Sequence, residues 1–335
     1  MADKPKVLFL GSTKQAQEEF ASLSEVVEVV NPQNSTDRAT FIEESKSGAF
    51  NGIQAIYRSN KTYGLAGNFD AELLDSLPKT LKFICHNGAG YDQIHIQECT
   101  SRGIRVSNTP TAVDDATADI TIFLLLGALR NLSSSIFALR EGTWRGNPAP
   151  SLGHDPQGKV LGILGMGGIG RNVARKARAF GMIVRYYNRS RLSPELEGDT
   201  EYVDFETLLK ESDVLSLNLP LNPNTRHTIA KPQFDMMKRG IVIINTARGA
   251  VMDEAALVDA LESGQVASAG LDVFENEPEV HPGLVNNRNV LLVPHMGTWT
   301  VETERAMAAW AFDNIRLAVT EGKLKSIVPE QSHLQ

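Results

Sequence analysis

A glycine-rich segment, Gly165-Met-Gly-Gly-Ile-Gly170, has the residue types and the spacing of a dinucleotide-binding loop. It follows a predicted strand over 159–164 and precedes a predicted helix over 171–180. In this position the first glycine permits a tight turn, the second admits a pyrophosphate close to the backbone, and the last lets helix pack on strand. A glycine-rich turn without a ligand is the alternative. The predicted cofactor contacts in this loop are Gly165, Gly167, Gly168, Ile169 and Gly170.

The residues after the next predicted strand, 182–187, indicate which dinucleotide binds. An acidic residue is expected about twenty residues beyond the loop, but the sequence has Asn188, Arg189 and Ser190 there. A carboxylate would accept from a free ribose 2′-hydroxyl and repel a 2′-phosphate, whereas arginine and serine can donate to that phosphate. The sequence therefore favours NADP(H), with NAD(H) possible. A solvated basic turn is the alternative interpretation.

Three polar side chains, Arg248, Glu277 and His295, each follow a later predicted strand. Ligands of doubly wound folds bind beyond these carboxyl ends. An arginine there can bind a carboxylate and polarise a carbonyl, and a histidine can deliver a proton near neutral pH. A carboxylate against the second ring nitrogen would fix the histidine tautomer and favour its charged form. Beside a nicotinamide, the set suits reduction of a 2-keto acid. Taken singly, each residue also has an ordinary structural interpretation.

Strand-like and helix-like segments alternate along the chain, which predicts parallel α/β architecture. The first part has predicted helices at 37–47, 70–77 and 95–102, and predicted strands at 6–10, 26–30, 55–59, 82–86 and 105–107. The second part has six predicted strands, which make a doubly wound sheet. These are 160–164, 183–187, 214–219, 241–245, 267–272 and 290–293.

Two further helical segments define the predicted domains. One runs from about 112 to 141 and is interpreted as a connector, and the other, 301–321, is expected to pack back on the first part. We therefore predict two Rossmann-like, doubly wound domains. The substrate domain is discontinuous, with residues 1–111 and 298–335, and the dinucleotide-binding domain is 112–297. Because the connector is apolar on more than one face, we expect a homodimer.

The length, charge, cysteine spacing and apolar runs of the sequence argue against several classes of function. A length of 335 residues suffices for two domains, and a formal charge of −7 argues against nucleic acid as the main partner. Cys85 and Cys99 lack metal-site spacing, so we expect no metal. The first six residues lack a signal-peptide pattern, and the apolar run 120–129 is too short to span a bilayer. We expect no membrane partner and a cytoplasmic location.

Along nearly its whole length, the chain resembles the D-isomer-specific 2-hydroxyacid dehydrogenase family. Three motifs carry the resemblance: Asn245-Thr-Ala-Arg-Gly249, Leu271-Asp-Val-Phe-Glu-Asn-Glu-Pro278 and Pro294-His-Met-Gly297. The resemblance implies that Arg248 anchors the substrate, that His295 is the acid/base and that Glu277 is its partner. Formate dehydrogenases of this family pair the histidine with glutamine, so Glu277 disfavours them.

The resemblance also implies binding residues outside these motifs. The segment Asn87-Gly-Ala-Gly-Tyr-Asp92 is similar to the family's substrate loop, where the Ala89 and Gly90 amides would hold a carboxylate. Arg58 matches a position near the substrate, with Asn60 where the family has threonine. Asp272 resembles a residue near the nicotinamide, but it can equally cap the next turn. The further cofactor contacts assigned are Thr117, Pro220, Thr225, Thr246, Ala247, Asp272 and Gly297.

Within the family, Asn188-Arg-Ser190 is most similar to the glyoxylate and hydroxypyruvate reductases, which implies an NADPH-dependent reductase of small 2-keto acids. The end of the chain at Gln335 is unlike the longer phosphoglycerate dehydrogenases. Dehydrogenases for bulkier branched or aryl acids, of the D-mandelate type, are one alternative. A nucleotide-sensing transcriptional corepressor is an alternative of another class, although such proteins usually carry extra disordered tails.

Overall fold

The computed structural model describes residues 4–334, which form two compact units. Unit 1 is Met1–Val113 with Trp299–Gln335, and unit 2 is Asp114–Thr298. The corresponding predicted limits were 1–111 with 298–335, and 112–297. Residues 1–3 and Gln335, on which the expectations about targeting partly depend, lie outside the described residues.

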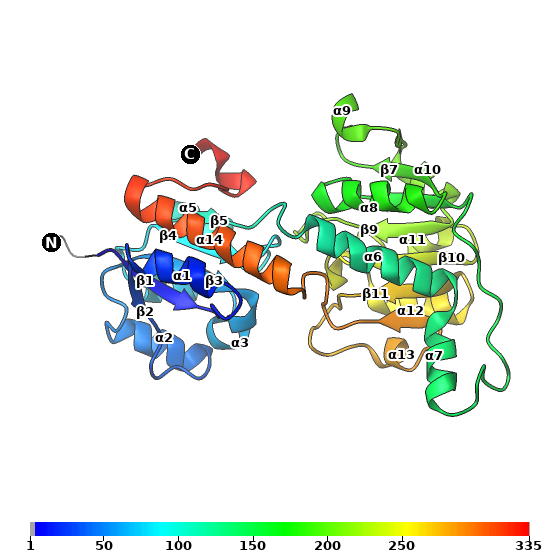
Figure 1. Cartoon of the computed structure of the whole chain (residues 1–335), viewed down its shortest axis with the longest axis horizontal. Coiled ribbons are helices and arrows are strands. Elements are labelled where there is room, and N and C mark those ends of the chain that lie inside the picture. The colour runs from blue at the N-terminus through cyan, green and yellow to red at the C-terminus, as the bar shows by residue number, and fades with distance from the viewer. Residues whose placement is uncertain (1–3, 335) are drawn as a thin grey trace. The chain divides into compact units, whose positions relative to one another are not determined.

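Unit 1 contains a five-stranded parallel sheet in the order β2-β1-β3-β4-β5 (Figure 1). Its strands are β1 Lys6–Leu10, β2 Glu28–Val30, β3 Ile53–Ser59, β4 Phe83–Asn87 and β5 Arg105–Ser107. Its helices are α1 Gln17–Ser24, α2 Arg38–Lys46, α3 Tyr63–Ala66, α4 Ala71–Ser76, α5 Ile96–Ser101 and α14 Val301–Glu321, with 3-10 helices η1 Asn60–Thr62 and η3 Pro329–Leu334.

Helix caps explain where two of these helices start, and buried side chains explain how the helices pack on the sheet. The Asp37 and Asp70 carboxylates accept from the amides of Thr40 and Leu73, which fixes the starts of α2 and α4. One face of the sheet buries residues of α2, α4 and α5. The other face buries residues of α1 and α14, with Phe312 against the Tyr57 ring at 5.2 Å between centroids. The last long helix is thus part of unit 1, although it follows all of unit 2 in the sequence.

Unit 2 contains a seven-stranded parallel sheet in the order β12-β11-β10-β9-β6-β7-β8. Its strands are β6 Val160–Leu164, β7 Ile183–Tyr187, β8 Glu201–Tyr202, β9 Val214–Leu217, β10 Ile241–Asn245, β11 Val266–Leu271 and β12 Val290–Leu292. Its helices are α6 Asp114–Leu129, α7 Leu132–Arg140, α8 Gly168–Ala179, α9 Pro194–Glu197, α10 Phe205–Glu211, α11 Lys231–Met236, α12 Glu254–Glu262 and α13 Pro282–Val285, with 3-10 helix η2 Gly249–Val251.

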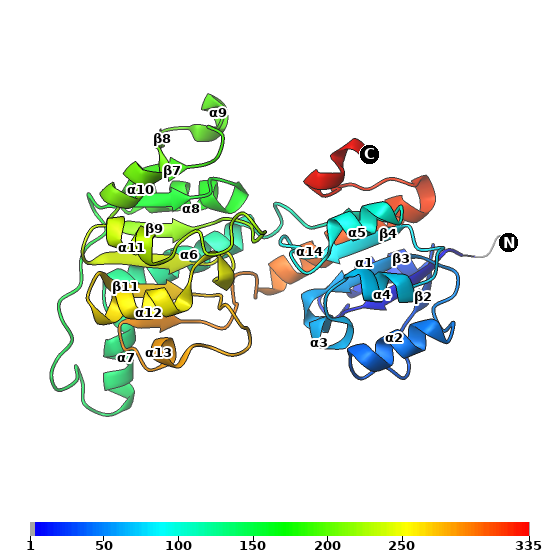
Figure 2. The ribbon, with the colours of Figure 1, turned by 180° about the vertical axis from the view of Figure 1, so that it is seen from behind.

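The order of these strands places a switch point in the middle of the sheet. From β6 the chain adds β7 and β8 on one side, and then β9 to β12 on the other. Helices α6 and α8 cover one face (Figure 1), and α10, α11 and α12 cover the other (Figure 2). Ligands of such sheets bind at the carboxyl ends beside the switch point. The two-residue strand β8 was not predicted, because two residues carry no periodicity.

The prediction of one helix over 112–141 is wrong. The chain forms α6 and α7, which bend by 77° at the break between them. The cause is local: Asn131, the residue before α7, has a left-handed backbone with φ of 50°, a conformation that asparagine tolerates better than most residues. Both helices belong to unit 2, with α6 packed against β10 and β11.

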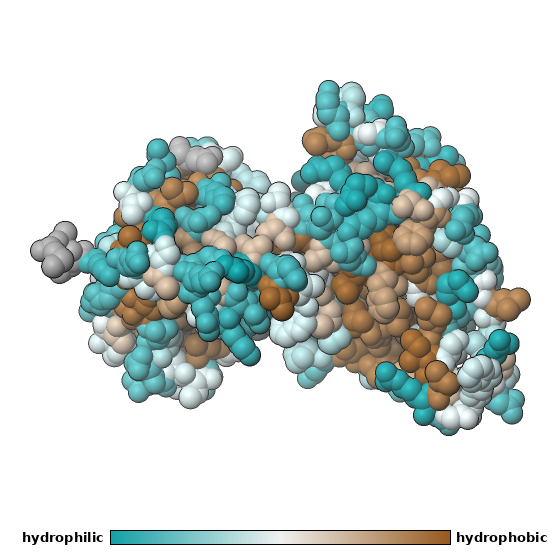
Figure 3. Space-filling model, in the orientation of Figure 1, coloured by the Kyte–Doolittle hydropathy of each residue, from teal (hydrophilic) through white to brown (hydrophobic). Residues whose placement is uncertain are grey.

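Helices α6 and α7 also carry much of the exposed apolar surface in unit 2. Figure 3 shows hydrophobic side chains gathered over this face. Within the described part of the chain, no single helix is long and apolar enough to cross a membrane. The bent pair α6 and α7 reaches the required length and apolar composition only when its two helices are taken together. The residues of this surface, here called the α6–α7 patch, are Phe123, Leu132, Ile136, Phe137 and Leu139.

Candidate active site

The glycine-rich loop joins β6 to α8 next to the switch point of unit 2. Gly165 has φ of 98°, and a Cβ there would lie 2.8 Å from the Asn218 carbonyl oxygen. A Cβ on Gly170 would collide with the Gly165 carbonyl, whereas a Cβ on Gly167 would meet no atom within 4 Å. The loop is therefore closely packed on one side and open on the other. This shape fits a pyrophosphate.

The helix after this loop starts earlier than predicted, at Gly168 instead of Arg171. The amides of Gly168, Ile169 and Gly170 thus belong to the first turn of α8, where helix amides have no intrahelical acceptor. Gly168 has a further constraint that the sequence did not reveal, because a Cβ there would collide with the Asp114 carboxylate. Burial raises the pKa of Asp114, and the charge of Arg171 opposes that shift.

The three residues after β7 have different environments. The Asn188 Oδ1 accepts from the Met166 amide at 2.7 Å, so Asn188 ties the end of β7 to the phosphate loop. Arg189 and Ser190 are exposed, and over residues 4–334 their side chains have no ion-pair or hydrogen-bond partner. Arg191, in contrast, pairs with the buried Glu197 at 3.0 Å. The geometry leaves Arg189 and Ser190 available for a ligand at this strand end.

His295 and Glu277 are brought together at the ends of β12 and β11. The Nδ1 atom of His295 lies 2.8 Å from Glu277 Oε2. Burial alone would raise the pKa of Glu277, but the hydrogen bond and charge of His295, the Phe274 amide and the charge of Arg248 hold it below the ordinary value. A charged carboxylate can only accept, so His295 carries a proton on Nδ1 and its Nε2 is the atom left to exchange protons.

The turn that carries His295 is held by Asp272. One Asp272 oxygen accepts from the Met296 amide, and the other accepts from the Gly297 amide at 2.8 Å. Burial raises the pKa of Asp272, and the Met296 amide opposes that shift. Asp272 therefore caps the turn of His295, and not the next turn after its own strand, which was the structural alternative. Thr117 on α6 is close by, 3.4 Å from where a Gly297 Cβ would stand.

Arg248 follows β10, and its segment packs directly against the one that carries Glu277. A Cβ on Gly249 would collide with the backbone of Phe274 and Glu275, so only glycine allows this approach. The Arg248 Nη1 donates to the Ala247 carbonyl at 2.8 Å. Its charge contributes to the lowered pKa of Glu277. The three side chains predicted from the strand ends thus belong to one region of unit 2.

The other predicted cofactor contacts have structural partners in unit 2. Thr246 Oγ1 lies 2.8 Å from Thr121 Oγ1 on α6. Thr225 Oγ1 donates to the Pro220 carbonyl at 2.6 Å and so closes the turn after β9. These contacts place the residues near the carboxyl ends of β9 and β10. Their cofactor contacts, and that of Ala247, stay predictions.

The predicted substrate residues of unit 1 are Arg58, Ala89 and Gly90. Arg58 is 1% exposed, and its guanidinium donates to Asn60 Oδ1 at 2.6 Å and to Gln93 Oε1. The Ala89 carbonyl accepts from Asn108 Nδ2 at 2.7 Å, and the Gly90 carbonyl lies 3.0 Å from His86 Nε2. Within the described part of the chain, the Ala89 and Gly90 amides have no acceptor. The loop is thus fixed through its carbonyls while these two amides stay available.

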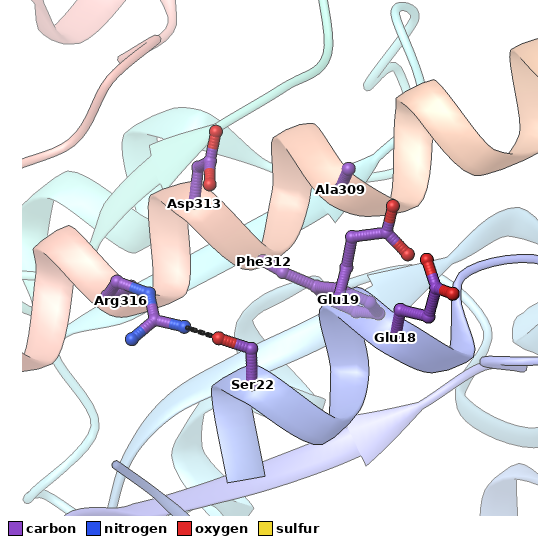
Figure 4. A pocket seen from close by; sticks show the side chains of 7 residues that line it. All are labelled: Glu18, Glu19, Ser22, Ala309, Phe312, Asp313 and Arg316. Atoms are coloured by element: carbon purple, nitrogen blue, oxygen red, sulfur yellow. Dashed lines mark hydrogen bonds between the residues drawn. The ribbon is translucent and has the colours of Figure 1, made fainter. Parts of the chain in front are cut away.

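A pocket in unit 1 lies between α1 and α14 and contains none of the predicted site residues (Figure 4). Its side chains include Glu18, Glu19 and Asp313, and Arg316 Nη2 donates to Ser22 Oγ at 3.0 Å.

Comparison with known proteins identifies the family. Residues 122–297, more than half of the chain, match the model for the NAD binding domain of D-isomer specific 2-hydroxyacid dehydrogenases. The chain is 56% identical to 4-methyl-2-oxopentanoate reductase A of Aspergillus oryzae, over 98% of this chain and 99% of that protein.

Two solved structures are similar over almost the whole chain. A glyoxylate reductase from Paecilomyes thermophila has 52% identity and a TM-score of 0.95, covering 99% of this chain and 100% of that one. The holo D-mandelate dehydrogenase of Rhodotorula graminis has 32% identity and a TM-score of 0.92, covering 98% of each chain. These relatives are enzymes, which disfavours the corepressor alternative. The chain belongs to the D-isomer-specific 2-hydroxyacid dehydrogenase family, as an oxidoreductase with a nicotinamide cofactor, similar to glyoxylate reductases.

Proposed function

We propose that this protein reduces small 2-keto acids to D-2-hydroxy acids with NADPH, with glyoxylate and hydroxypyruvate as the preferred substrates. The observation that carries the proposal is the contact between His295 Nδ1 and Glu277 Oε2 at the carboxyl edge of the unit 2 sheet. A histidine held in this way presents its second nitrogen as a proton donor. That group is what ketone reduction needs beside a hydride donor.

The residues divide the chemistry between them. A reduced nicotinamide supplies the hydride to the carbonyl carbon when it is bound. Arg248 binds the substrate carboxylate and polarises the carbonyl, and His295 Nε2 donates the proton that the carbonyl oxygen takes up. Glu277 stays ionised and stabilises the charged imidazole before the transfer. One hydride and one proton together convert the carbonyl group into the alcohol.

The proposed preference for NADPH depends on the residues after β7. Arg189 and Ser190 supply hydrogen-bond donors at the position where a ribose-binding carboxylate is expected. Such a carboxylate would repel a 2′-phosphate, whereas these donors can bind it. Both are exposed, and Asn188 anchors them to the phosphate loop through the Met166 amide at 2.7 Å. The contacts of Arg58, Ala89 and Gly90 with substrate belong to the same proposal, which the two available amides support. We also propose that the enzyme is cytoplasmic.

A second candidate is an enzyme for bulkier acids. The 56% identical relative is named for 4-methyl-2-oxopentanoate, and one similar structure is a D-mandelate dehydrogenase. For both candidates the substrate carries a carboxylate beside a carbonyl group, and His295 is the proposed proton donor. The substrates of the two candidates differ only in the substituent on C2, which the active site must accommodate.

The test is a kcat/KM series over glyoxylate, hydroxypyruvate, pyruvate, 4-methyl-2-oxopentanoate and phenylglyoxylate, each with NADPH and with NADH. We expect the highest values for the first two acids with NADPH, and the D isomer from every substrate that gives a chiral product. A maximum at 4-methyl-2-oxopentanoate or phenylglyoxylate would select the second candidate. An L product would contradict the proposed stereochemistry.

A further inference from the structure

One short segment of unit 2 carries two glutamates, and each of them contacts a histidine from another part of the chain. The function proposed above uses only one of these two histidine–glutamate pairs. Residues 274–277 carry both carboxylates. Glu277 contacts His295, whereas Glu275 contacts His227, with 2.6 Å between its Oε1 and His227 Nε2. His227 comes from the loop between β9 and α11, far from this segment in sequence. No motif predicted this second pair.

Glu275 is fixed in place by more than His227. Arg226 Nη2 donates to the same Glu275 oxygen at 2.7 Å, and the Glu275 amide donates to Glu254 Oε1 at 2.6 Å. Glu254, the first residue of α12, is 5% exposed, and burial raises its pKa. The Glu275 side chain itself is 16% exposed. Hydrogen bonds to charged groups with this little water around them are strong, so they restrain the segment that carries Glu277.

His227 is also attached to the Arg248 segment. Its amide donates to the Ala250 carbonyl at 2.9 Å, two residues beyond Arg248. Its backbone has φ of 51°, a left-handed conformation that is costly for a residue other than glycine. Such a conformation persists only where the surroundings hold it. In this conformation His227 bonds to the Arg248 segment through its backbone amide and to residues 274–277 through its ring.

We propose that His227 is a positioning residue for the His295–Glu277 pair and for Arg248. Through Glu275 it holds residues 274–277 so that Glu277 stays against His295, and through Ala250 it holds the segment of Arg248. The inference rests on the proposed function for its kinetic consequences. In this role His227 touches neither substrate nor cofactor.

Charged groups from several elements surround the two pairs. Arg226 and Glu254 face Glu275, while Arg248 faces Glu277. Asp272 interacts electrostatically with both His295 and Glu277, and His281, just before α13, does so with Glu254. Because a carboxylate only accepts, His227 Nε2 carries a proton whether the ring is neutral or charged. The contact with Glu275 therefore does not require His227 to be charged.

The test compares His227→Ala with His227→Gln. Both replacements keep a Cβ and hence the same backbone strain, but only glutamine can donate to Glu275 from about the position of Nε2. For glyoxylate reduction we expect alanine to lower kcat/KM about tenfold, through a lower kcat and a higher KM, because small displacements of reacting groups are costly. The alkaline limb of its pH profile should move to lower pH. Glutamine should restore most of the loss, and the dissociation constant of NADPH should stay unchanged in both variants.

A second measurement does not depend on activity. The His295 ring is followed by NMR in protein with carbon-13-labelled histidine, and a His295→Asn variant assigns its signal. The titration midpoint of His295 should move to lower pH in His227→Ala, because Glu277 is then held less firmly, and it should return in His227→Gln. Glu275→Ala should reproduce the alanine shift by removing the acceptor, which keeps the test available if His227→Ala does not fold. His154→Ala, in an exposed loop, is the matched control.

The outcomes separate the two proposals. If the unaltered protein reduces no 2-keto acid, the proposed function fails, while the NMR shift still tests the positioning role. If the His295 midpoint and the KM for glyoxylate are unchanged in His227→Ala and Glu275→Ala, the positioning role is wrong. It is equally wrong if His227→Gln is impaired as much as His227→Ala.

Discussion

At the scale of single residues, the proposed proton transfer depends on the contact between His295 and Glu277, two side chains at strand ends of the unit 2 sheet. Arg248, Glu277 and His295 could be selected from the sequence because each follows a buried strand and because parallel strands present their carboxyl ends on one edge. The capping role of Asp272 and the His227–Glu275 contact could not. Both depend on which loop backbones meet in space, and neither partner is near in sequence.

The charge of Glu277 can be tested through the pH dependence of reduction. The lowered pKa of Glu277 means that its carboxylate is ionised at neutral pH, where it favours the charged form of His295. In Glu277→Gln the amide no longer does so, and the alkaline limb of kcat/KM should begin at lower pH. Glu279→Gln, at an exposed position two residues away, is the control. An unchanged pH profile in Glu277→Gln would rule out the pairing as a catalytic feature.

Arg189 decides the proposed choice between the two cofactors. Arg189→Ala should weaken NADPH binding by about 1–3 kcal/mol, because a charged hydrogen bond to the 2′-phosphate is lost. Binding of NADH should change little. The control is Arg185→Ala on β7, the strand that precedes Arg189, since Arg185 is already paired with Glu201 at 2.7 Å. Equal weakening of both cofactors by Arg189→Ala, measured by fluorescence titration, would remove the argument for NADPH.

At the scale of elements, the sequence predicted well where the signal was local. The strands β6, β7 and β10 and the helix α14 have the predicted limits, because apolar runs or an apolar stripe mark them. The split of the connector into α6 and α7 was missed because no glycine or proline stands at the break, only Asn131. The early start of α8 was missed because two of its first three residues are glycines, which have low helix propensity.

Two glycines of the phosphate loop separate binding from folding. A Cβ on Gly167 meets no atom within 4 Å, so Gly167→Ala should keep its thermal stability and lose affinity for NADPH, because the methyl group enters the space left for the pyrophosphate. A Cβ on Gly170 collides with the Gly165 carbonyl, so Gly170→Ala should lower the free energy of unfolding by about 1–3 kcal/mol. Calorimetry and NADPH titration of both variants test this. Unimpaired NADPH binding by Gly167→Ala would contradict the placement of the pyrophosphate.

At the scale of the whole molecule, we propose a homodimer that covers the α6–α7 patch. Its side chains are partly exposed, for example Phe137 at 49% and Leu139 at 58%, and large exposed apolar patches usually mark interfaces. Sedimentation velocity at micromolar concentration should show a dimer for the unaltered protein and a monomer for Phe137→Glu with Leu139→Glu. Leu196→Glu, at an exposed leucine on α9, should remain dimeric. A monomeric unaltered protein would contradict the proposal.

The central claim is that His295 donates the proton when this protein reduces a 2-keto acid with NADPH. The most direct measurement is the single-turnover rate of NADPH oxidation by glyoxylate in His295→Ala, together with the dissociation constant of NADPH. We predict that the rate falls by at least about a hundredfold, because the variant lacks the general acid. The dissociation constant of NADPH should be unchanged, because the substitution leaves the phosphate loop intact. A rate close to that of the unaltered protein would show that another group supplies the proton and would contradict this account.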